Sequence, residues 1–501
     1  MALRSDIYDD IYFSNQSGIE ESMYTFIEAN RLTDRFRTFK NGRPFTVGEL
    51  GFGTGLNFLL TAKSFLENAS EPSILHYFSV EKHPLPINLI NDSLSDFEWL
   101  GDLRQRLMKL LRESSWRIQG FHTLFFDRRV RLTILTGDVF DRLQELSGGS
   151  FDAWFADGFA PTKNPDMWTL PVFQEVARLS KPGTTISSFS SAGEVRRNLH
   201  KAGFSIQKKA GYGNKREMIT GQFNGKELKT EFEAALSTNQ TAVIVGGGIS
   251  GLSVAEALLK RGWQVQLNER HSKLASEASG NPTAMFLPYL TADKTAISDL
   301  TFRGSETFIS ALPAIKASHL LYRTGILQRT GITNQVDLTE SISLVSGKQQ
   351  NLEEKTKQRN NRISRAVIAN GLPRSFFRKI ADHHYFMRKA GWTQPAKLCD
   401  HLAHTLKEEY GEQFTINKLS SIDFDNLPTA DAIILATGTE LSKFKVASFI
   451  PIISVRGQFF ECNSNRAIEF LNQSKNESYC KPKLSIKRPI LYENYIIPKK
   501  T

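Results

Sequence analysis

Two glycine-rich turns, at positions 51–55 and 246–251, constrain this chain more than any other feature of its sequence. Each turn follows an apolar segment and precedes a segment whose apolar residues recur with helical spacing. Glycine is needed where a chain turns sharply and where a ligand approaches the backbone with no Cβ in the way. Because the two turns differ in their glycine spacing, we expect two different nucleotide-binding α/β units in tandem and no internal repeat.

Length and composition are those of a multidomain globular protein. The chain has 501 residues, and at about 100 to 200 residues per domain this length predicts about two to four domains. The proportions of 40% hydrophobic and 23% charged residues exclude a disordered or fibrous chain. No apolar run reaches the roughly 18 residues of a membrane-spanning helix. The first ten residues lack the apolar core of a secretory signal, so we expect none.

The net charge indicates the kind of binding partner, and the cysteine content indicates the cellular compartment. The chain has 63 Lys and Arg against 52 Asp and Glu, a net charge of +11, which favours a polyanionic partner such as nucleic acid. A lysine-rich surface that maintains solubility explains the same charge equally well. Cys399, Cys462 and Cys480 are too few and too widely spaced for a disulfide framework, so we expect the cytoplasm. His401 and His404 lack metal-ligating neighbours, and we expect no metal.

Apolar runs alternate with helix-like segments through the first unit. A helix is expected at 166–179, between the last two of five short strands. This alternation predicts a mostly parallel sheet with helices on both faces. The strands are expected at 45–50, 74–80, 131–136, 151–156 and 184–189.

The polar segment 221–240 is expected to be a linker between two domains. We therefore place the first domain at 1–235. The second domain, at 241–501, begins with a strand, turn, helix and strand within 241–270 and has a later apolar strand in 431–438. We expect a mixed α+β substrate subdomain between these two parts of the second domain.

Acidic residues follow successive strands of the first unit. Glu81 ends the second strand, Asp138 follows the third, and Asp157 follows the fourth. Because the carboxyl ends of parallel strands meet at one edge of a sheet, these residues and the glycine turn are expected to converge on one ligand. A carboxylate at Glu81 can accept hydrogen bonds from two ribose hydroxyls, and Asp138 can bind an adenine edge. The predicted cofactor-binding residues here are Glu49, Gly51, Gly53, Gly55, Glu81 and Asp138.

This pattern resembles the class I S-adenosylmethionine-dependent methyltransferases. The segments DDIYFSNQSGIEES at 9–22 and DGFAPTKNPDMW at 157–168 are similar to the methyltransferase half of the bifunctional tRNA 5-methylaminomethyl-2-thiouridine biosynthesis proteins. The resemblance spans residues 5–225. It implies S-adenosylmethionine as methyl donor and the aminomethyl nitrogen of a tRNA wobble uridine as acceptor. Asp157 is our catalytic candidate, which would orient the amine and take up its proton; the alternative is a carboxylate that only anchors its loop.

Three N-terminal residues have two interpretations. Tyr12, Phe13 and Asn15 would form either a lid over the cofactor or a platform for an unpaired base, since aromatic rings stack on bases. They would equally suit a packed N-terminal strand, and the sequence leaves this choice open.

The second glycine turn has the dinucleotide-binding pattern. In VIVGGGISG, the residues Gly246, Gly248 and Gly251 lie between an apolar strand and a helix, and Glu269 ends the next strand. A pyrophosphate would lie at the helix N-terminus and Glu269 would bind a ribose. NAD and FAD both use this pattern, so it does not choose between them.

Further segments favour FAD. The segment DAIILATG, ending in Thr437 and Gly438, resembles the FAD-dependent oxidoreductases. SEASGNPTAMFLPYL at 276–290 and RGQ at 456–458 are similar to the oxidase half of the same bifunctional family. That resemblance implies a glycine-oxidase-like reaction, in which a carboxymethylaminomethyl group is oxidised to an imine that water cleaves. The aminomethyl product would be the substrate of the methyltransferase half. Members of the family continue past the end of this sequence, so we expect an incomplete oxidase domain.

Basic clusters suggest where tRNA could bind. The run at 355–379 holds eight Lys or Arg and no acidic residue, and such a run either tracks phosphates or is a solvated surface. Shorter clusters occur in the first domain, at Arg128, Arg129 and Arg131 and at Lys208, Lys209, Lys215 and Arg216.

Three alternatives to a bifunctional tRNA-modifying enzyme remain open. One is a small-molecule methyltransferase fused to an amine oxidase, and another is a methyltransferase with a non-functional oxidase half. A third is a tRNA-binding protein that retains both folds without turnover. We expect a monomer that does not associate with membranes.

Overall fold

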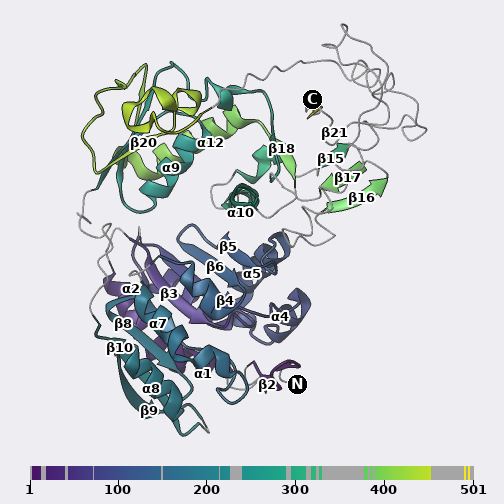
Figure 1. Ribbon diagram of the computed structural model, residues 1–501, viewed down its shortest axis with the longest axis vertical. Coiled ribbons are helices and arrows are strands. Elements are labelled where there is room, and N and C mark those ends of the chain that lie inside the picture. Colours follow the sequence, from purple (N-terminus) through teal and green to yellow (C-terminus); the bar gives the residue numbers. More distant parts are fainter. Residues whose placement is uncertain are drawn as a thin grey trace. The chain divides into compact units, whose positions relative to one another are not determined.

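The structure is a computed structural model that divides into two compact units (Figure 1). The first comprises Met1–Ala242, Glu256–Val265 and Glu306–Ile315, and the second comprises the remaining residues. The residues described by the structure are 3–12, 18–39, 43–71, 73–147, 151–213, 215–225, 240–288, 295–311, 317–322, 326–329, 377–381, 384–387, 390–452, 490–491 and 495–496.

Several sequence features fall outside these ranges. They are Phe13, Asn15, Cys462, Cys480, most of the predicted linker, most of the basic run at 355–379, and RGQ at 456–458. Cys399 lies within them and is a buried free thiol.

An eight-stranded sheet forms the centre of the first unit. Its order is β5-β6-β4-β3-β7-β8-β10-β9, and neighbours among β6, β4, β3, β7 and β8 are parallel. Strand β5 pairs antiparallel with β6, and β10 pairs antiparallel with both β8 and β9. The parallel strands are β3 (Phe45–Leu50), β4 (Leu75–Glu81), β6 (Val130–Thr136), β7 (Phe151–Phe155) and β8 (Ser180–Ser188); the others are β5 (Gly120–Phe125), β9 (Phe204–Ala210) and β10 (Glu217–Phe223).

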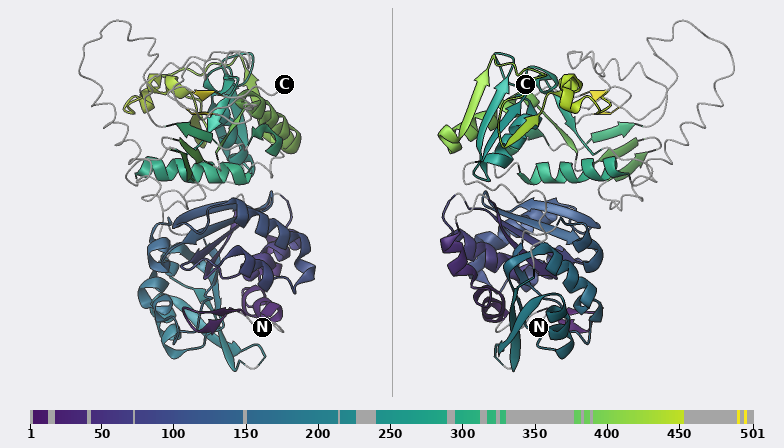
Figure 2. Two further views of the ribbon diagram at one scale, coloured as in Figure 1. Left: turned by 90° about the vertical axis from the view of Figure 1, so that its right-hand side faces the viewer. Right: turned by 60° about the vertical axis from the view of Figure 1, so that its left-hand side comes forward.

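Helices cover both faces of this sheet because its strands are apolar on both sides (Figures 1 and 2). Along β7, Ala153 and Phe155 belong to one buried cluster, whereas Trp154 belongs to the other. The first cluster includes residues of α2 (Leu32–Thr38), α3 (Leu56–Asn68), α4 (Ile87–Ser93) and α5 (Gly101–Glu113), beside α1 (Gly18–Ser22). The second includes residues of α6 (Val139–Gln144), α7 (Leu170–Leu179) and α8 (Gly193–Lys201).

The predicted alternation of parallel strands and helices is confirmed, but β8 begins at Ser180 instead of residue 184, and the antiparallel strands β5, β9 and β10 were not predicted. The helix expected from residue 166 begins at Leu170, after a 3-10 turn at Pro165–Trp168. Thr169 is extended (φ −77°, ψ 157°) and Pro171 lies in the first helical turn. Proline fits the first helical turn because its missing N–H has no helical partner there.

The second unit begins with the predicted strand, turn, helix and strand. These are β11 (Thr241–Val245), α9 (Ile249–Leu259) and β12 (Gln264–Glu269), in a sheet of order β19-β12-β11-β20. Backbone bonds from Gln264 N to Gln240 O and from Gly246 N to Asn268 O show that β11 and β12 run parallel. The remaining strands of this sheet are β19 (Phe414–Lys418) and β20 (Ala432–Leu435).

Further sheets and helices give the second unit its mixed α+β part, as expected. One sheet contains β13 (Ala284–Phe286), β18 (Gly391–Thr393) and β14 (Leu321–Tyr322). The helices of this mixed part include α10 (Ala296–Ala311) and α12 (Pro395–Tyr410). Another sheet contains β16 (Phe377–Ala381), β17 (His384–Met387), β15 (Ile326–Arg329), β21 (Ile490–Leu491) and β22 (Tyr495–Ile496).

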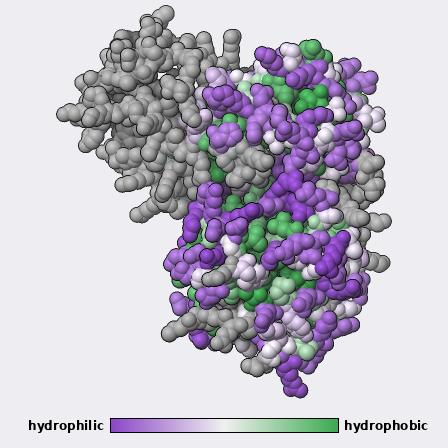
Figure 3. Space-filling model, turned by 180° about the vertical axis from the view of Figure 1, so that it is seen from behind, coloured by the Kyte–Doolittle hydropathy of each residue, from purple (hydrophilic) through white to green (hydrophobic). Residues whose placement is uncertain are grey.

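Hydrophilic side chains cover most of the coloured face in Figure 3, with apolar side chains between them. None of the helices in the described ranges combines the length and apolar character that a bilayer crossing requires.

Candidate active site

A cavity opens at the carboxyl ends of the parallel strands of the first unit. The space between its walls, together with its open mouth, is about 910 Å³. The segments that follow β3, β4, β6 and β7 all line it. The chain order reverses between β3 and its neighbours β4 and β7, and such switch points are where open α/β sheets bind ligands.

The glycine turn after β3 forms one wall of the cavity. Gly51 has φ +118°, and a Cβ there would lie 3.3 Å from the Asp157 carbonyl oxygen. Gly53 has φ +51°, and a Cβ there would lie 3.2 Å from the Tyr12 ring. Both φ values are in the region that favours glycine. Gly55 (φ +78°) is the N-cap of α3. Gly51 and Gly53 line the cavity, whereas the position of a Cβ on Gly55 would be occupied by the packed side chains of Phe52 and Leu107.

Glu81 is fixed at the end of β4 by two backbone donors. The Gly53 N–H donates to its Oε2 at 2.9 Å, and the His83 N–H donates to its Oε1 at 2.7 Å. Burial raises the pKa of Glu81, and these two hydrogen bonds oppose that rise. Each carboxylate oxygen can accept a second hydrogen bond. A pair of neighbouring hydroxyls, as on a ribose, is the donor set that this carboxylate fits.

Asp138 lies at the N-terminus of α6, on the same edge of the sheet. Its Oδ1 accepts from the Phe140 N–H at 3.0 Å, and its Oδ2 accepts from Lys82 Nζ at 3.0 Å. Burial alone would raise the pKa of Asp138, but the hydrogen bonds from Lys82 and Phe140 outweigh it and lower that pKa. Sequence reasoning missed Lys82, which follows Glu81 directly and lines the cavity.

Asp157 and Glu49 are bridged by one amide. Nδ2 of Asn57 donates to Asp157 Oδ2 at 2.7 Å and to Glu49 Oε1 at 2.9 Å, while the Ser79 hydroxyl donates to Glu49 Oε2 at 2.6 Å. Asp157 and Asn57 line the cavity, and Glu49 lies behind them with 1% of its surface exposed. Burial raises the pKa of Asp157 to about 6 and that of Glu49 to about 8. At neutral pH the pair therefore carries one negative charge, on the carboxylate that faces the cavity.

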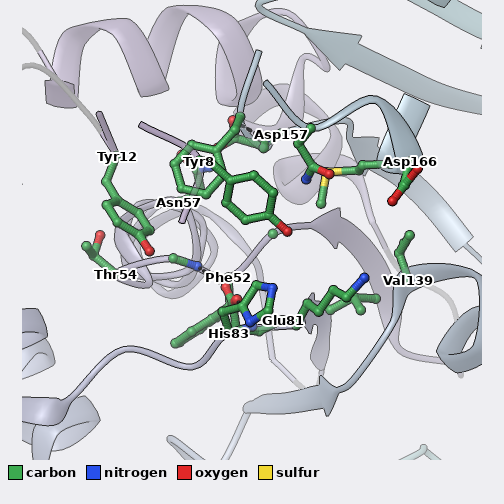
Figure 4. A pocket seen from close by; sticks show the side chains of 18 of the residues that line it. Tyr8, Tyr12, Phe52, Thr54, Asn57, Glu81, His83, Val139, Asp157 and Asp166 are labelled. Carbon is green, nitrogen blue, oxygen red and sulfur yellow. Dashed lines mark hydrogen bonds between the residues drawn. The ribbon is translucent and has the colours of Figure 1, made fainter. Parts of the chain in front are cut away.

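A short N-terminal hairpin covers the cavity (Figure 4). Its strands are β1 (Arg4–Ser5) and β2 (Asp10–Ile11). The ring of Tyr8 stacks on Phe159 with centroids 4.8 Å apart, and the ring of Tyr12 contacts Phe159 edge-on at 5.1 Å. Oδ2 of Asp10 accepts from the Ala160 N–H at 3.0 Å. Tyr12 lines the cavity beside the glycine turn, a position that suits either a lid over the cofactor or a platform for an unpaired base.

The glycine turn of the second unit has a matching arrangement. Oε2 of Glu269 accepts from the Gly247 N–H at 2.8 Å, and its Oε1 accepts from the His271 N–H at 2.9 Å. Gly246 has φ +113°, and a Cβ there would overlap the Ala436 carbonyl oxygen. A Cβ on Gly251 would overlap the carbonyl oxygen of Gly246. The turn therefore packs tightly against α9 and the end of β20. Two backbone N–H groups fix the carboxylate of Glu269, as two others fix that of Glu81 in the first unit.

Two hydroxyls adjoin this second turn. The Ser279 hydroxyl accepts from the Ile249 N–H at 3.1 Å at the start of α9. The Thr437 hydroxyl is buried and has no hydrogen-bond partner among the described residues. Gly438 follows with φ +55°, and the position of a Cβ on it has no heavy atom within 4 Å. A helix N-terminus, a fixed carboxylate and a buried hydroxyl together fit the phosphates and ribose of a dinucleotide such as FAD.

Comparison with known proteins identifies the class. Residues 102–224 match the S-adenosyl-L-methionine-dependent methyltransferase family, and residues 241–480 match the FAD dependent oxidoreductase family. The chain is therefore a bifunctional enzyme with a methyltransferase part and an oxidoreductase part, and its cofactors are S-adenosylmethionine and FAD.

Curated relatives give the particular family. The tRNA 5-methylaminomethyl-2-thiouridine biosynthesis bifunctional protein MnmC of Pseudomonas fluorescens is 35% identical over 480 residues, covering 91% of this chain and 69% of that protein. The protein of the same name from Pseudomonas aeruginosa is 34% identical over 475 residues, with coverages of 91% and 69%. This chain belongs to the MnmC family. The crystal structure of MNMC2 from Aquifex aeolicus is 26% identical, covering 46% of this chain and 70% of that one, with a TM-score of 0.36.

Proposed function

We propose that this enzyme completes a modification of the wobble uridine of tRNA in two steps. Its 241–501 domain removes the carboxymethyl group of 5-carboxymethylaminomethyl-(2-thio)uridine by oxidation. Its 1–235 domain then methylates the aminomethyl product to 5-methylaminomethyl-(2-thio)uridine. The names of the curated relatives support tRNA as substrate over the alternative of a small-molecule methyltransferase fused to an amine oxidase. A tRNA substrate also supports the expected cytoplasmic location.

The observation that carries the methyl-transfer step is the buried carboxylate of Asp157 at the cavity wall. Bound S-adenosylmethionine supplies an electrophilic methyl group. Glu81 holds the ribose of this donor and Asp138 its adenine edge, as their positions at two strand ends support. Gly51 and Gly53 line the cavity and would contact the donor through their backbone, while Gly55 supports the turn as the N-cap of α3. These assignments are the ones predicted from the sequence, and the geometry supports each as a proposal.

Asp157 orients the acceptor amine and takes up its proton. The amine nitrogen bonds to the methyl carbon as the carbon–sulfur bond breaks, and one proton must leave the nitrogen. With a pKa of about 6, the carboxyl of Asp157 is ionised at neutral pH and close in pKa to the working range of a general base. Asn57 holds this carboxylate from behind, through the amide that also contacts Glu49. Glu49 therefore acts on the site through Asn57 and is a positioning residue.

The residues of the second turn hold the redox cofactor in this proposal. Bound FAD supplies the two-electron oxidant. Gly246 and Gly251 allow the turn to pack closely at the start of α9, where the pyrophosphate would lie beside Gly248, and Glu269 would receive the ribose hydroxyls. Thr437 and Gly438 lie at the end of β20, beside the same turn, and contact the cofactor there. Flavin absorbance of the purified chain tests whether this half loads its cofactor.

The sharpest test of the methyl-transfer step replaces Asp157 by asparagine. The change keeps the shape of the side chain and removes the proton acceptor, so methyl transfer to tRNA that carries the aminomethyl group should fall by about 10² to 10⁴. Binding of S-adenosylmethionine, measured by calorimetry, should persist. Asp102→Asn, the same change at an exposed position of α5, is the control. Near-normal methyl transfer by Asp157→Asn would rule out the catalytic role.

A second experiment tests the substrate. Labelled S-adenosylmethionine is incubated with the enzyme and either tRNA lacking the final methyl group or small primary amines. Nucleoside analysis should find the label in 5-methylaminomethyl-(2-thio)uridine. Label in the small amines alone would favour the small-molecule alternative. Light scattering and metal analysis of the same preparation test the predictions that the enzyme is a monomer without bound metal.

A further inference from the structure

One edge of the first unit is strongly basic. Between residues 193 and 223 the sequence contains seven Lys or Arg and two acidic residues. These cations lie on α8, on β9, which is the last strand of the sheet, and on the turn before β10. We call this set the basic edge, and its members are Arg196, Arg197, Lys201, Lys208, Lys209, Lys215 and Arg216.

The cations of the basic edge are close enough to act on a common group. Glu217 of β10 pairs with Lys208 of β9 at 2.7 Å. Its pKa is lowered by the hydrogen bond from Lys208 and further by the charges of Arg216 and Arg196. Three cations from three elements thus surround one carboxylate. The side chains of Lys201 and Lys209 are exposed and have no ion-pair partner within the described ranges, which leaves the edge with uncompensated positive charge.

A lysine on an edge strand also prevents unwanted pairing with another sheet. That role explains Lys208 and Lys209, because β9 is exposed along residues 207–210. It does not explain the three cations of α8, a helix that presents no strand edge. A ligand with extended negative charge accounts for both sets.

The basic edge is attached to the wall of the active-site cavity. The Tyr24 hydroxyl donates to the Ala210 carbonyl oxygen at 3.1 Å, at the end of β9. Lys215 forms an ion pair with Glu21. Ser22, the next residue, lines the cavity. The charge of Lys215 also lowers the pKa of the catalytic candidate Asp157. The basic edge therefore begins beside the residues that line the cavity.

We propose that the basic edge binds the phosphate backbone of the substrate RNA next to the nucleotide whose base enters the cavity. This inference rests on the proposed function and adds the surface that positions the substrate. Contacts to phosphates fix register and orientation without reading sequence. Lys201 and Lys209 provide positive charge that no neighbouring carboxylate offsets. The charges of Lys208 and Lys215 are partly neutralised by their ion pairs with Glu217 and Glu21.

Charge reversal on the full-length enzyme tests the proposal. Lys201→Glu and Lys209→Glu are combined in one variant. The control combines Lys109→Glu and Arg112→Glu, exposed cations of α5, which packs on the other face of the sheet. Binding of fluorescent tRNA is measured by anisotropy over a range of salt concentrations. S-adenosylmethionine affinity and thermal unfolding are measured alongside, because an intact cofactor site shows that the fold survives.

The test variant should bind tRNA at least tenfold more weakly at about 0.1 M salt. The plot of log affinity against log salt concentration should become less steep by about 1.4 to 1.8, because each of the two lost phosphate contacts contributes about 0.7 to 0.9 to its slope. The control should match the wild type, and both should bind S-adenosylmethionine normally.

Two results would overturn the proposal. One is a test variant with wild-type affinity and salt slope, and the other is an equal loss in the control, which would indicate a general effect of net charge. Failure of the proposed function has a different signature, since the wild-type enzyme itself would then transfer no methyl group to tRNA.

Discussion

Replacing Glu49 tests whether this buried carboxyl is protonated in the folded enzyme. Burial raises its pKa to about 8, so the group is neutral at pH 7. Glutamine has the same shape without charge, and its amide can pair with both Asn57 and Ser79. Leucine fills similar space but offers no acceptor to the Asn57 amide or to the Ser79 hydroxyl. Comparing the two variants with the wild type therefore separates the effect of the side chain's shape from the effects of its hydrogen bonds and its proton.

The expected change in the free energy of unfolding follows from the linkage between proton binding and folding. With a pKa near 4.5, the usual value for glutamate, when unfolded and about 8 when folded, Glu49 binds one more proton in the folded state between these values. Its contribution to stability is fully present below the unfolded pKa and is lost as the pH rises through the folded pKa. The slope is about 1.4 kcal/mol per pH unit, or roughly 3 kcal/mol between about pH 5 and about pH 7.5. Glu49→Gln lacks this dependence, so its stability relative to wild type should rise by that amount over the same interval.

Glu49→Leu should be less stable at every pH. It leaves two buried donors without an acceptor, at about 1 to 3 kcal/mol each. It also removes one of the two contacts that hold Asn57 against Asp157.

Urea titration at several pH values measures these differences. Because the chain has two units, the first is followed separately, with a brief hydrogen-exchange pulse and mass spectrometry of peptides from β3 and β4. If Glu49→Gln and the wild type show parallel pH dependence from about pH 5 to about pH 7.5, Glu49 does not hold its proton and the reasoning fails.

Three further outcomes are expected. Methyl transfer by the wild type should decline as the pH falls below about 6, because Asp157 becomes protonated, and a rate profile without this limb would contradict its role as proton acceptor. Glu81→Gln should weaken S-adenosylmethionine binding at least tenfold in calorimetry, because an amide replaces the charged acceptor and turns one N–H toward the donor at Gly53 or His83; unchanged affinity would count against ribose binding. Gly251→Ala should abolish flavin absorbance of the purified enzyme, because the added Cβ would overlap the backbone of the turn, and a normal flavin spectrum would show that the turn can adjust.

The sequence was sufficient to place the parallel strands of the first unit, of which β3 and β6 are buried along their whole length, but it did not indicate the antiparallel strands β5, β9 and β10. Strand β3 coincides with the predicted segment at 45–50, and β6 lies within one residue of its prediction. Residues that follow strand ends could be assigned to one site from topology alone. Gly51, Glu81 and Asp157 accordingly surround one cavity.

Other parts of the site depended on contacts that no local pattern contains. Glu49 precedes the turn by only two residues, but successive side chains of a strand point to opposite faces, and it lies on the side of α3 behind Asn57. Lys82 and Tyr8 reach the cavity from segments without a recognisable motif. Ser279 lies 30 residues from the helix start whose N–H it binds. Their roles became apparent only when the fold brought distant segments together.

The N-terminal hairpin has a thermodynamic consequence for substrate binding. A ribbon with two residues in each strand has little stability of its own. It is kept in place by the loop after β7, through the Ala160 N–H and the ring of Phe159, and it holds that loop in return. Whatever orders one segment reduces the entropy cost of ordering the other. Binding of the methyl donor under Tyr12 should therefore strengthen binding of the acceptor beside Asp157, and by reciprocity bound acceptor should raise the affinity for the donor by the same factor.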